Sequence, residues 1–132
     1  MSPLLRSFVF LLVLATASCQ AVMVSKDELN VDVSDFELIM DTTSNGILLD
    51  VRTDNEFAQG HLRGAQQIDF YMNDFSNALE KLDKDQPVFI YCRSGNRSGK
   101  TAQQMKAMGF SEVYNLEGGI SAWSKRGKPI AK

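Results

Sequence analysis

The sequence predicts an α/β domain built on a mainly parallel sheet with helices on both faces. Segments of strand character alternate with segments of helical periodicity, which is the pattern of repeated β–α units. Two of the strand segments, residues 47–51 and 87–91, are continuous apolar runs, as expected for strands that are buried on both faces. A loop with a single cysteine follows the second run, at the edge where ligands of parallel sheets bind.

Each element of the domain has its own sequence signal. Helices are predicted where a capping box opens a segment, with Ser34 before Glu37 and Thr53 before Glu56. The second of these helices should end at Gly60. In chain order, we expect strands at residues 29–33, 47–51, 65–69, 87–91 and 112–116, and helices at 34–41, 53–59, 74–82, 98–108 and 120–127.

The first part of the chain, residues 1–18, is predicted to be a signal peptide and not part of the domain. Arg6 supplies a positive charge, residues 8–15 are apolar on every side, and small residues follow before Cys19. The apolar run is too short to cross a bilayer, which needs about 20 residues. A buried first helix of the domain is the alternative, but no amphipathic segment continues the run.

The residues before Cys19 resemble a bacterial lipobox, in which a lipidated cysteine becomes the mature N-terminus. Cleavage by ordinary signal peptidase after Ala17 competes with this interpretation, because Thr16 stands where an aliphatic residue is usual. In either case we expect an exported protein, periplasmic or anchored as a lipoprotein in a bacterial envelope. The lipid anchor would be its only contact with the membrane. The tether would then span residues 19–29 and the domain residues 30–132.

The overall charge and the cysteine count restrict the function further. The net charge is −2 and no basic run stands out, so a nucleic-acid partner is not expected. The two cysteines of the chain are Cys19 and Cys92. If Cys19 is lipidated, Cys92 is a lone thiol in an oxidising compartment, where an accessible and unused thiol is a liability. Cys92 is therefore the candidate for chemistry.

The loop around Cys92 has the composition of an anion-binding site that activates a thiol. Gly95 frees the backbone to turn, and the first amides of the following helix have no intrahelical partners. Those amides, the helix dipole and the charges of Arg93 and Arg97 should lower the pKa of the thiol. A thiolate in that setting is the nucleophile that covalent catalysis requires. Ser98 is expected to be the N-cap of the helix, a substrate contact or both.

The spacing from Cys92 to Arg97 helps to choose between two chemistries. Cysteine phosphatases have an arginine one position later, where this chain has Ser98. The shorter loop suits a single transferred sulfur atom better than a tetrahedral phosphate. A phosphatase also needs a general acid, and the sequence does not position Asp50 or Asp54 well for that role. A cysteine phosphatase or arsenate reductase is kept as a remote alternative.

Three segments resemble the blocks of single-domain rhodaneses, the thiosulfate-type sulfurtransferases. They are LLDVRTDNEFAQGHLRGAQQID, VFIYCRSGNRSGKTAQQMKAMGF and VYNLEGGISAWSKRGKP, and they occur in the family's order between Ile47 and Pro129. The resemblance implies a five-stranded parallel sheet flanked by helices. It also implies that Cys92 takes a sulfane sulfur from a donor such as thiosulfate, holds it as a persulfide and passes it to cyanide or a thiol. No metal and no organic cofactor would be needed.

The resemblance also implies roles for the rest of the loop. Its backbone amides would hold the transferred sulfur, while Arg97 and Arg93 would attract the anionic donor. The expected partners are a small sulfur-donor anion, a thiol or cyanide acceptor, and a protein that accepts sulfur. The alternative is a carrier or redox-binding module that uses the same cysteine without turnover. The residues assigned to the substrate-binding loop are Arg93, Ser94, Gly95, Asn96, Arg97 and Ser98.

Three further polar residues lie in the first of these segments. Asp50 and Arg52 come near the carboxyl end of their strand, so they are secondary candidates for the site. His61 is the only histidine of the chain and thus the only histidine that is available as a base for Cys92. In the family this segment is mainly architectural, and a cysteine that is already a thiolate needs no base.

Overall fold

The computed structural model describes residues 29–132 of the chain. Strands and helices alternate along this part of the chain, as the sequence predicts. In chain order the elements are β1 (Asn30–Val31), α1 (Val33–Thr42), β2 (Ile47–Asp50), α2 (Asp54–Gln59), β3 (Gln66–Gln67), α3 (Phe75–Glu80), β4 (Val88–Tyr91), α4 (Asn96–Ala107), β5 (Val113–Leu116) and α5 (Gly119–Lys125).

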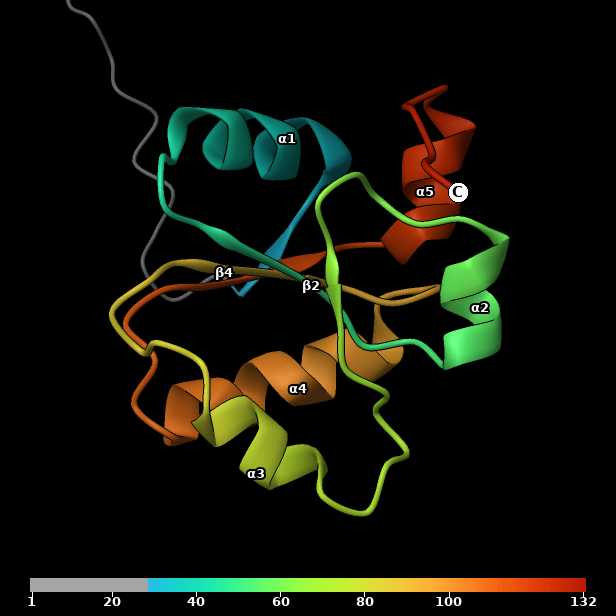
Figure 1. The fold of residues 1–132 in the computed structure, drawn as a ribbon. Coiled ribbons are helices and arrows are strands. Elements are labelled where there is room, and N and C mark those ends of the chain that lie inside the picture. Colours follow the sequence, from blue (N-terminus) through green and yellow to red (C-terminus); the bar gives the residue numbers. More distant parts are fainter. Residues whose placement is uncertain (1–28) are drawn as a thin grey trace, which may run out of the picture.

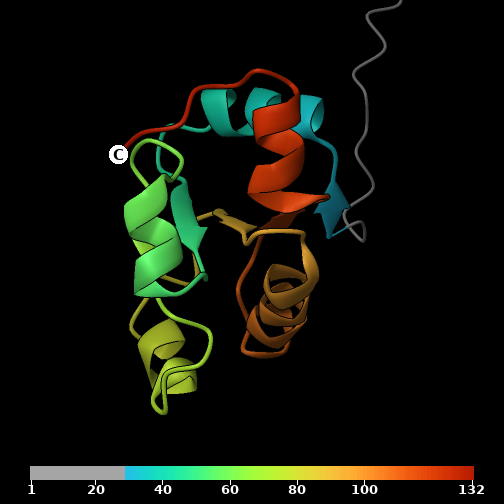
Figure 2. The same cartoon turned by 90° about the vertical axis from the view of Figure 1, so that its right-hand side faces the viewer.

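The strands form one five-stranded sheet in the order β1–β5–β4–β2–β3, and every pair is parallel. β4 is the central strand, and all of its residues and those of β2 are buried. α1 and α5 cover one face of the sheet, and α3 and α4 cover the other (Figure 1). Figure 2 shows these two helical layers from the side, with α2 beside the sheet. The predicted fold class is confirmed.

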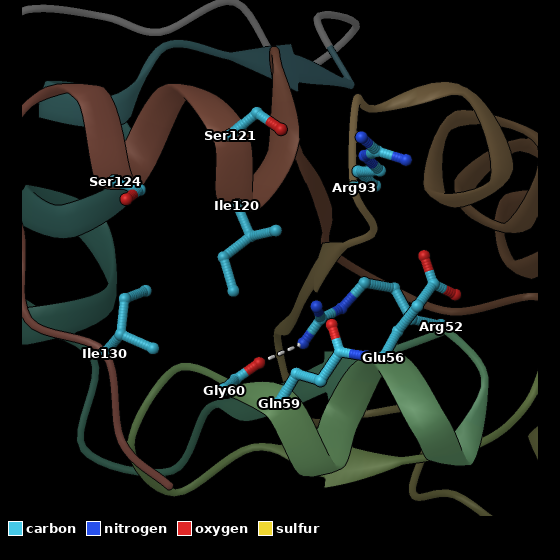
Figure 3. A pocket seen from close by; sticks show the side chains of 9 residues that line it. All are labelled: Arg52, Glu56, Gln59, Gly60, Arg93, Ile120, Ser121, Ser124 and Ile130. Carbon is cyan, nitrogen blue, oxygen red and sulfur yellow. Dashed lines mark hydrogen bonds between the residues drawn. The ribbon is translucent and has the colours of Figure 1, made fainter.

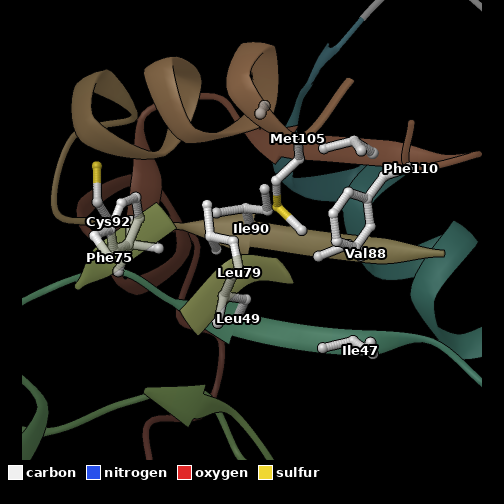
Figure 4. Packing of buried hydrophobic residues seen from close by; sticks show 12 residues of the cluster. Ile47, Leu49, Phe75, Leu79, Val88, Ile90, Cys92, Met105 and Phe110 are labelled. Carbon is white, nitrogen blue, oxygen red and sulfur yellow. The ribbon is translucent and has the colours of Figure 1, made fainter. Parts of the chain in front are cut away.

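Successive residues of β4 contribute to two separate cores, because side chains alternate between the faces of a strand. Val88 and Ile90 belong to the core beneath α3 and α4 (Figure 4). Phe89 and Tyr91 belong to the core beneath α1 and α5. Cys92 continues this alternation just past the end of the strand, so its side chain packs in the core beneath α3 and α4.

The starts of the first two helices show how well capping signals can be read. α2 has the predicted capping box, with the side chain of Thr53 bound to the backbone of Glu56 and the reverse bond also present. The predicted cap of α1 is wrong. The carboxylate of Asp32, not the hydroxyl of Ser34, accepts the N–H of Asp35 at 2.9 Å. Both residue types are good caps, and the structure uses the earlier one.

Residues 1–28 lie outside the described part of the chain. They contain the predicted signal peptide, the predicted lipidation site Cys19 and nearly all of the predicted tether. Within residues 29–132, no helix has the length and apolar character needed to cross a membrane.

Candidate active site

Cys92 lies at the carboxyl edge of the sheet, directly after the central strand β4. This is the edge at which parallel α/β sheets bind their ligands. The residue is 1% exposed, so the thiol is almost completely covered. Residues 92–98, which we call the active-site loop, lead from β4 into the first turn of α4.

Two hydrogen bonds reach the sulfur of Cys92. The backbone N–H of Gly95 and the hydroxyl of Ser98 both donate to Sγ, each at 3.2 Å. Burial raises the pKa of the thiol, but the hydroxyl of Ser98 and the backbone N–H groups of Ser98, Ser94 and Gly95 lower the pKa by more. The net effect is a pKa below the usual value for cysteine, which favours the thiolate.

The start of α4 explains why Ser98 is free to bind the sulfur. The helix begins at Asn96 and its N-cap is Gly95, with φ of 96°. The prediction that Ser98 caps this helix is therefore wrong, because Ser98 lies inside the first turn. A glycine in the left-handed region starts the helix without any side-chain signal. A Cβ on Gly95 would also lie 3.3 Å from the backbone nitrogen of Gly118.

The N-terminus of α5 holds the active-site loop through backbone contacts. The N–H of Ile120 donates to the carbonyl of Cys92 at 2.9 Å, and the N–H of Ser121 donates to the carbonyl of Arg93 at 3.1 Å. Gly119 makes this approach feasible, because a Cβ there would lie 2.4 Å from the carbonyl oxygen of Cys92. The sequence pattern alone did not single out Gly119.

Arg97, the predicted donor-binding residue, is bound to Glu56 of α2. Its Nη1 and Nη2 donate to the two carboxylate oxygens of Glu56, both at 2.8 Å. Its guanidinium also lies 5.7 Å from the ring centre of Tyr71. The positive charge that the sequence assigned to a substrate is thus neutralised within the domain. Sequence reasoning recognised Glu56 only as a cap, because the partner is distant in the chain.

Asp50 and Arg52 form a buried ion pair behind the active-site loop. Arg52 Nη2 lies 2.7 Å from the Asp50 carboxylate and also 2.7 Å from the carbonyl of Gly60. Burial lowers the pKa of Arg52, but the Asp50 carboxylate raises it by more, so the guanidinium stays charged. The pair fixes the chain that follows β2, and within residues 29–132 no hydrogen bond joins either residue to Cys92. Their contacts agree with a structural role.

His61 contacts the end of the helix that precedes it, α2. Its ring stacks on Phe57, with the ring centres 3.9 Å apart, and its Nδ1 lies 3.1 Å from the carbonyl of Phe57. Its backbone pairs with Ala131 in an isolated antiparallel bridge. Within residues 29–132, no hydrogen bond joins the His61 ring to Cys92.

A pocket of about 580 Å³ opens beside the active-site loop. Figure 3 shows side chains of α2 on one wall, side chains of α5 on another, and Arg93 at one end. Arg93, Ser94 and Asn96 are exposed residues of the active-site loop. Among the described residues, no group of three or more His, Cys, Asp or Glu side chains is placed to hold a metal ion. The lining residues are Arg52, Glu56, Gln59, Gly60, Arg93, Ile120, Ser121, Ser124 and Ile130.

The fold and the site define an α/β protein with an activated cysteine in an amide-rich loop after its central strand. The rhodanese-like domain family matches residues 32–126. The chain belongs to the rhodanese-like domain family.

Several relatives of this chain are named as sulfurtransferases. A sulfurtransferase of Allochromatium vinosum is 39% identical over 88 residues, which cover 67% of this chain and 80% of the relative. Thiosulfate sulfurtransferase GlpE of Ectopseudomonas mendocina is 38% identical over 82 residues, which cover 61% of this chain and 72% of the relative. The uncharacterized protein YqhL of Bacillus subtilis is 40% identical over 85 residues, and the match spans 64% of each protein.

Solved structures share the fold. The rhodanese-like domain protein of Staphylococcus aureus is 27% identical, with a TM-score of 0.66 over 80% of this chain and 100% of that one. A rhodanese-related protein of Thermoplasma volcanium has a TM-score of 0.68 at 23% identity and covers 79% of this chain and 98% of that one, a likeness of fold alone.

Proposed function

We propose that this chain is a sulfurtransferase that carries a sulfane sulfur as a persulfide on Cys92. The observation that carries the proposal is the pair of hydrogen bonds to Sγ from Gly95 and Ser98. Both donors stabilise negative charge on sulfur, which a nucleophile needs before attack and a persulfide needs afterwards. Relatives named sulfurtransferase and thiosulfate sulfurtransferase support the same chemistry.

In the first half-reaction the Cys92 thiolate attacks the outer sulfur of a donor such as thiosulfate. A bond forms between Sγ and that sulfur, and the bond between the two sulfur atoms of the donor breaks. The electron pair of the broken bond leaves with sulfite. The enzyme is left as a Cys92 persulfide, whose negative outer sulfur suits the amides at the start of α4.

In the second half-reaction an acceptor removes the outer sulfur. Cyanide or a thiolate attacks it, and the bond to Sγ breaks with its electron pair returning to Cys92 as thiolate. The two half-reactions make a ping-pong scheme with no metal and no organic cofactor. Since the charge of Arg97 is neutralised by Glu56, we expect the loop amides and Arg93 to supply most of the attraction for the anionic donor.

A second candidate is a sulfur carrier that receives persulfide from a partner and hands it on without turnover. The burial of Cys92, which is 1% exposed, favours it, because access would limit the reaction with small donors. A thiosulfate:cyanide assay separates the two functions. A carrier would hold one labile sulfur but turn over poorly.

The decisive experiment is an intact-mass measurement of the purified domain after incubation with thiosulfate. We expect a gain of one sulfur atom, about 32 Da, because the nucleophile holds its cargo covalently. The gain should be absent in Cys92→Ser and should be removed by cyanide or a reducing thiol. If no sulfane donor forms an adduct, the persulfide proposal is overturned.

We also propose that the protein is exported and anchored through a lipid on Cys19, on the sequence pattern of residues 1–18 alone. Detergent-phase partitioning of the full chain expressed in a bacterial host should then depend on Cys19. Partitioning that survives Cys19→Ala would refute the lipid anchor. A full chain that stays in the host's cytoplasm would refute export.

A further inference from the structure

One buried polar side chain close to the active-site loop, that of Asn115, has no part in the chemistry proposed above. Asn115 lies in β5, between β1 and β4, and is 2% exposed. Because side chains alternate along a strand, it lies on the same face as Val113, in the core beneath α3 and α4. Gly99 of α4 leaves room for its amide, since a Cβ there would lie 3.3 Å from Nδ2. A polar amide thus occupies a position where the core would accept an apolar side chain.

The amide nitrogen of Asn115 reaches two different parts of the fold. Nδ2 donates to Oδ1 of Asn30 at 2.7 Å and to the backbone carbonyl of Gly95 at 3.2 Å. Asn30 is the first residue of the edge strand β1, and Gly95 belongs to the active-site loop. A backbone carbonyl can only accept a hydrogen bond, so the amide must face Gly95 with its nitrogen. The side chain of Asn115 therefore links the edge of the sheet to the active-site loop.

This arrangement reduces stability, which indicates a role other than packing. The Oδ1 atom of Asn115 is buried and has no hydrogen-bond partner within residues 29–132. A buried polar atom without a partner costs free energy, whereas an apolar group of the same shape in its place can be neutral or stabilising. An apolar side chain at this position would therefore serve the core at least as well. It could not supply the hydrogen bond to Gly95.

Gly95 is a residue at which a further restraint affects the sulfur directly. Its N–H donates to Sγ of Cys92 at 3.2 Å and lowers the pKa of the thiol. Its φ is 96°, and a glycine moves easily in this region because it has no Cβ. Its carbonyl accepts the N–H of Gly99 at 2.9 Å, and the bond from Asn115 occupies the second lone pair. With its carbonyl held twice, Gly95 keeps its N–H directed at the sulfur.

We propose that Asn115 is a positioning residue for Cys92. Its amide, which is held in turn by Asn30, fixes the carbonyl of Gly95 and so keeps the N–H of Gly95 directed at Sγ. The proposal rests on the use of Cys92 as the nucleophile proposed above and adds a residue that supports it. Within residues 29–132, no hydrogen bond joins Asn115 to Sγ, so Asn115 acts through Gly95.

The test compares the pH profiles of Cys92 alkylation by iodoacetamide in wild type, Asn115→Leu and Asn30→Ala. Leucine has nearly the shape of asparagine but donates no hydrogen bond. Alanine at the exposed position 30 removes the acceptor that holds the amide of Asn115. Both exchanges are between neutral residues, so the charges near Sγ, including that of Arg97, do not change. Any shift of the profile then reports the loss of hydrogen bonds.

Both variants should raise the pKa of Cys92, because its thiolate loses a well-directed N–H. Alkylation below that pKa should slow by about threefold in Asn115→Leu, near the lower end of what one hydrogen bond contributes, and by less in Asn30→Ala. The rate at high pH, where the thiol is fully ionised, should not fall, because access to the sulfur is unchanged. The urea midpoint of Asn115→Leu should equal or exceed that of wild type, since the unpartnered oxygen is gone.

Tyr114→Phe is the matched control. It removes the hydrogen bond of 3.3 Å from the Tyr114 hydroxyl to Glu112, at the neighbouring position of β5 on the other face of the sheet. Its alkylation profile should match that of wild type. A wild-type profile in Asn115→Leu or in Asn30→Ala, or an equal shift in Tyr114→Phe, overturns the proposal. If Asn115→Leu does not fold, Asn30→Ala decides alone, because Asn30 is exposed.

The alkylation profiles report on the thiol itself and need no sulfur donor. If wild type forms a persulfide but the profiles of all variants coincide, the role of Asn115 is overturned and the proposed function stands. If the profiles shift as expected but no donor forms a persulfide, Asn115 still positions the loop, and the proposed function is overturned.

Discussion

Arg97 and Glu56 form a two-point ion pair that ties the active-site loop to α2, with both nitrogen–oxygen distances at 2.8 Å. Glu56 also accepts the backbone N–H of Thr53 and so completes the capping box of α2. The bond from Arg97 is the main cause that lowers the pKa of Glu56 to about 2. One carboxylate thus starts a helix and positions a loop.

The first prediction concerns the two roles of Glu56 in stability. Glu56→Gln keeps an oxygen that can cap α2 but removes the charge, and should reduce the free energy of unfolding by about 1 kcal/mol. Glu56→Ala removes the cap as well and should cost about 1 kcal/mol more. Urea denaturation of the three proteins measures both steps. Equal stability of the two variants would show that the cap contributes nothing.

The second prediction concerns acid stability. The pKa of Glu56 falls from 4.5 to about 2 on folding, so its contribution is present above pH 4.5 and is lost as the pH falls through about 2. The difference in unfolding free energy between wild type and Glu56→Gln should therefore shrink from about pH 6 to about pH 3. The other carboxylates titrate in both proteins and cancel. A difference that stays constant would contradict the ion pair.

The third prediction concerns the hydroxyl of Ser98. Ser98→Ala removes a donor to Sγ from a buried site, so the pKa of Cys92 should rise and its alkylation near neutral pH should slow. The pH profile of the iodoacetamide reaction measures the pKa directly. Ser94→Ala is the matched control, because Ser94 acts on the sulfur through its backbone N–H, which alanine retains. Equal profiles for the two variants would contradict a role for the hydroxyl.

The fourth prediction concerns the contact between α5 and the active-site loop. Gly119 and Gly127 both have positive φ, 59° and 70°, but only a Cβ on Gly119 meets other atoms within 4 Å. Gly127→Ala should cost about 1 kcal/mol of stability and leave persulfide formation intact. Gly119→Ala should cost clearly more and slow persulfide formation. Thermal unfolding and the intact-mass assay provide the two readouts, and similar behaviour of the variants would contradict the contact.

The sequence was sufficient for the fold class and for the position of Cys92 directly after the central strand. Apolar runs and capping signals are local, and they located the central strands and the box formed by Thr53 and Glu56. The edge strands β1 and β3 have two residues each, shorter than predicted, because apolar pattern does not report where pairing ends. Ser34 and Ser98 were predicted to cap their helices. Asp32 and Gly95, which lie a few positions earlier in the chain, are the N-caps instead.

The sequence alone could not show which residues pair with the charged residues of the site. Arg97 and Glu56 come from different helices, and nothing in either segment indicates that their side chains meet. Without that contact, Arg97 and Arg93 were both expected to attract the anionic donor. A role of either arginine in donor binding stays a prediction. It is tested by measuring the first half-reaction, the formation of the persulfide from the donor.

The contacts from α5 also determine when, during synthesis of the chain, the active-site loop can be held in place. Cys92 is synthesised before residues 119–125, and until that helix is present the carbonyls of Cys92 and Arg93 lack the amides that hold them. A partly made chain therefore contains the cysteine but not the finished loop around it. The backbone contacts that hold the loop around Cys92 are therefore complete only when α5 packs against it.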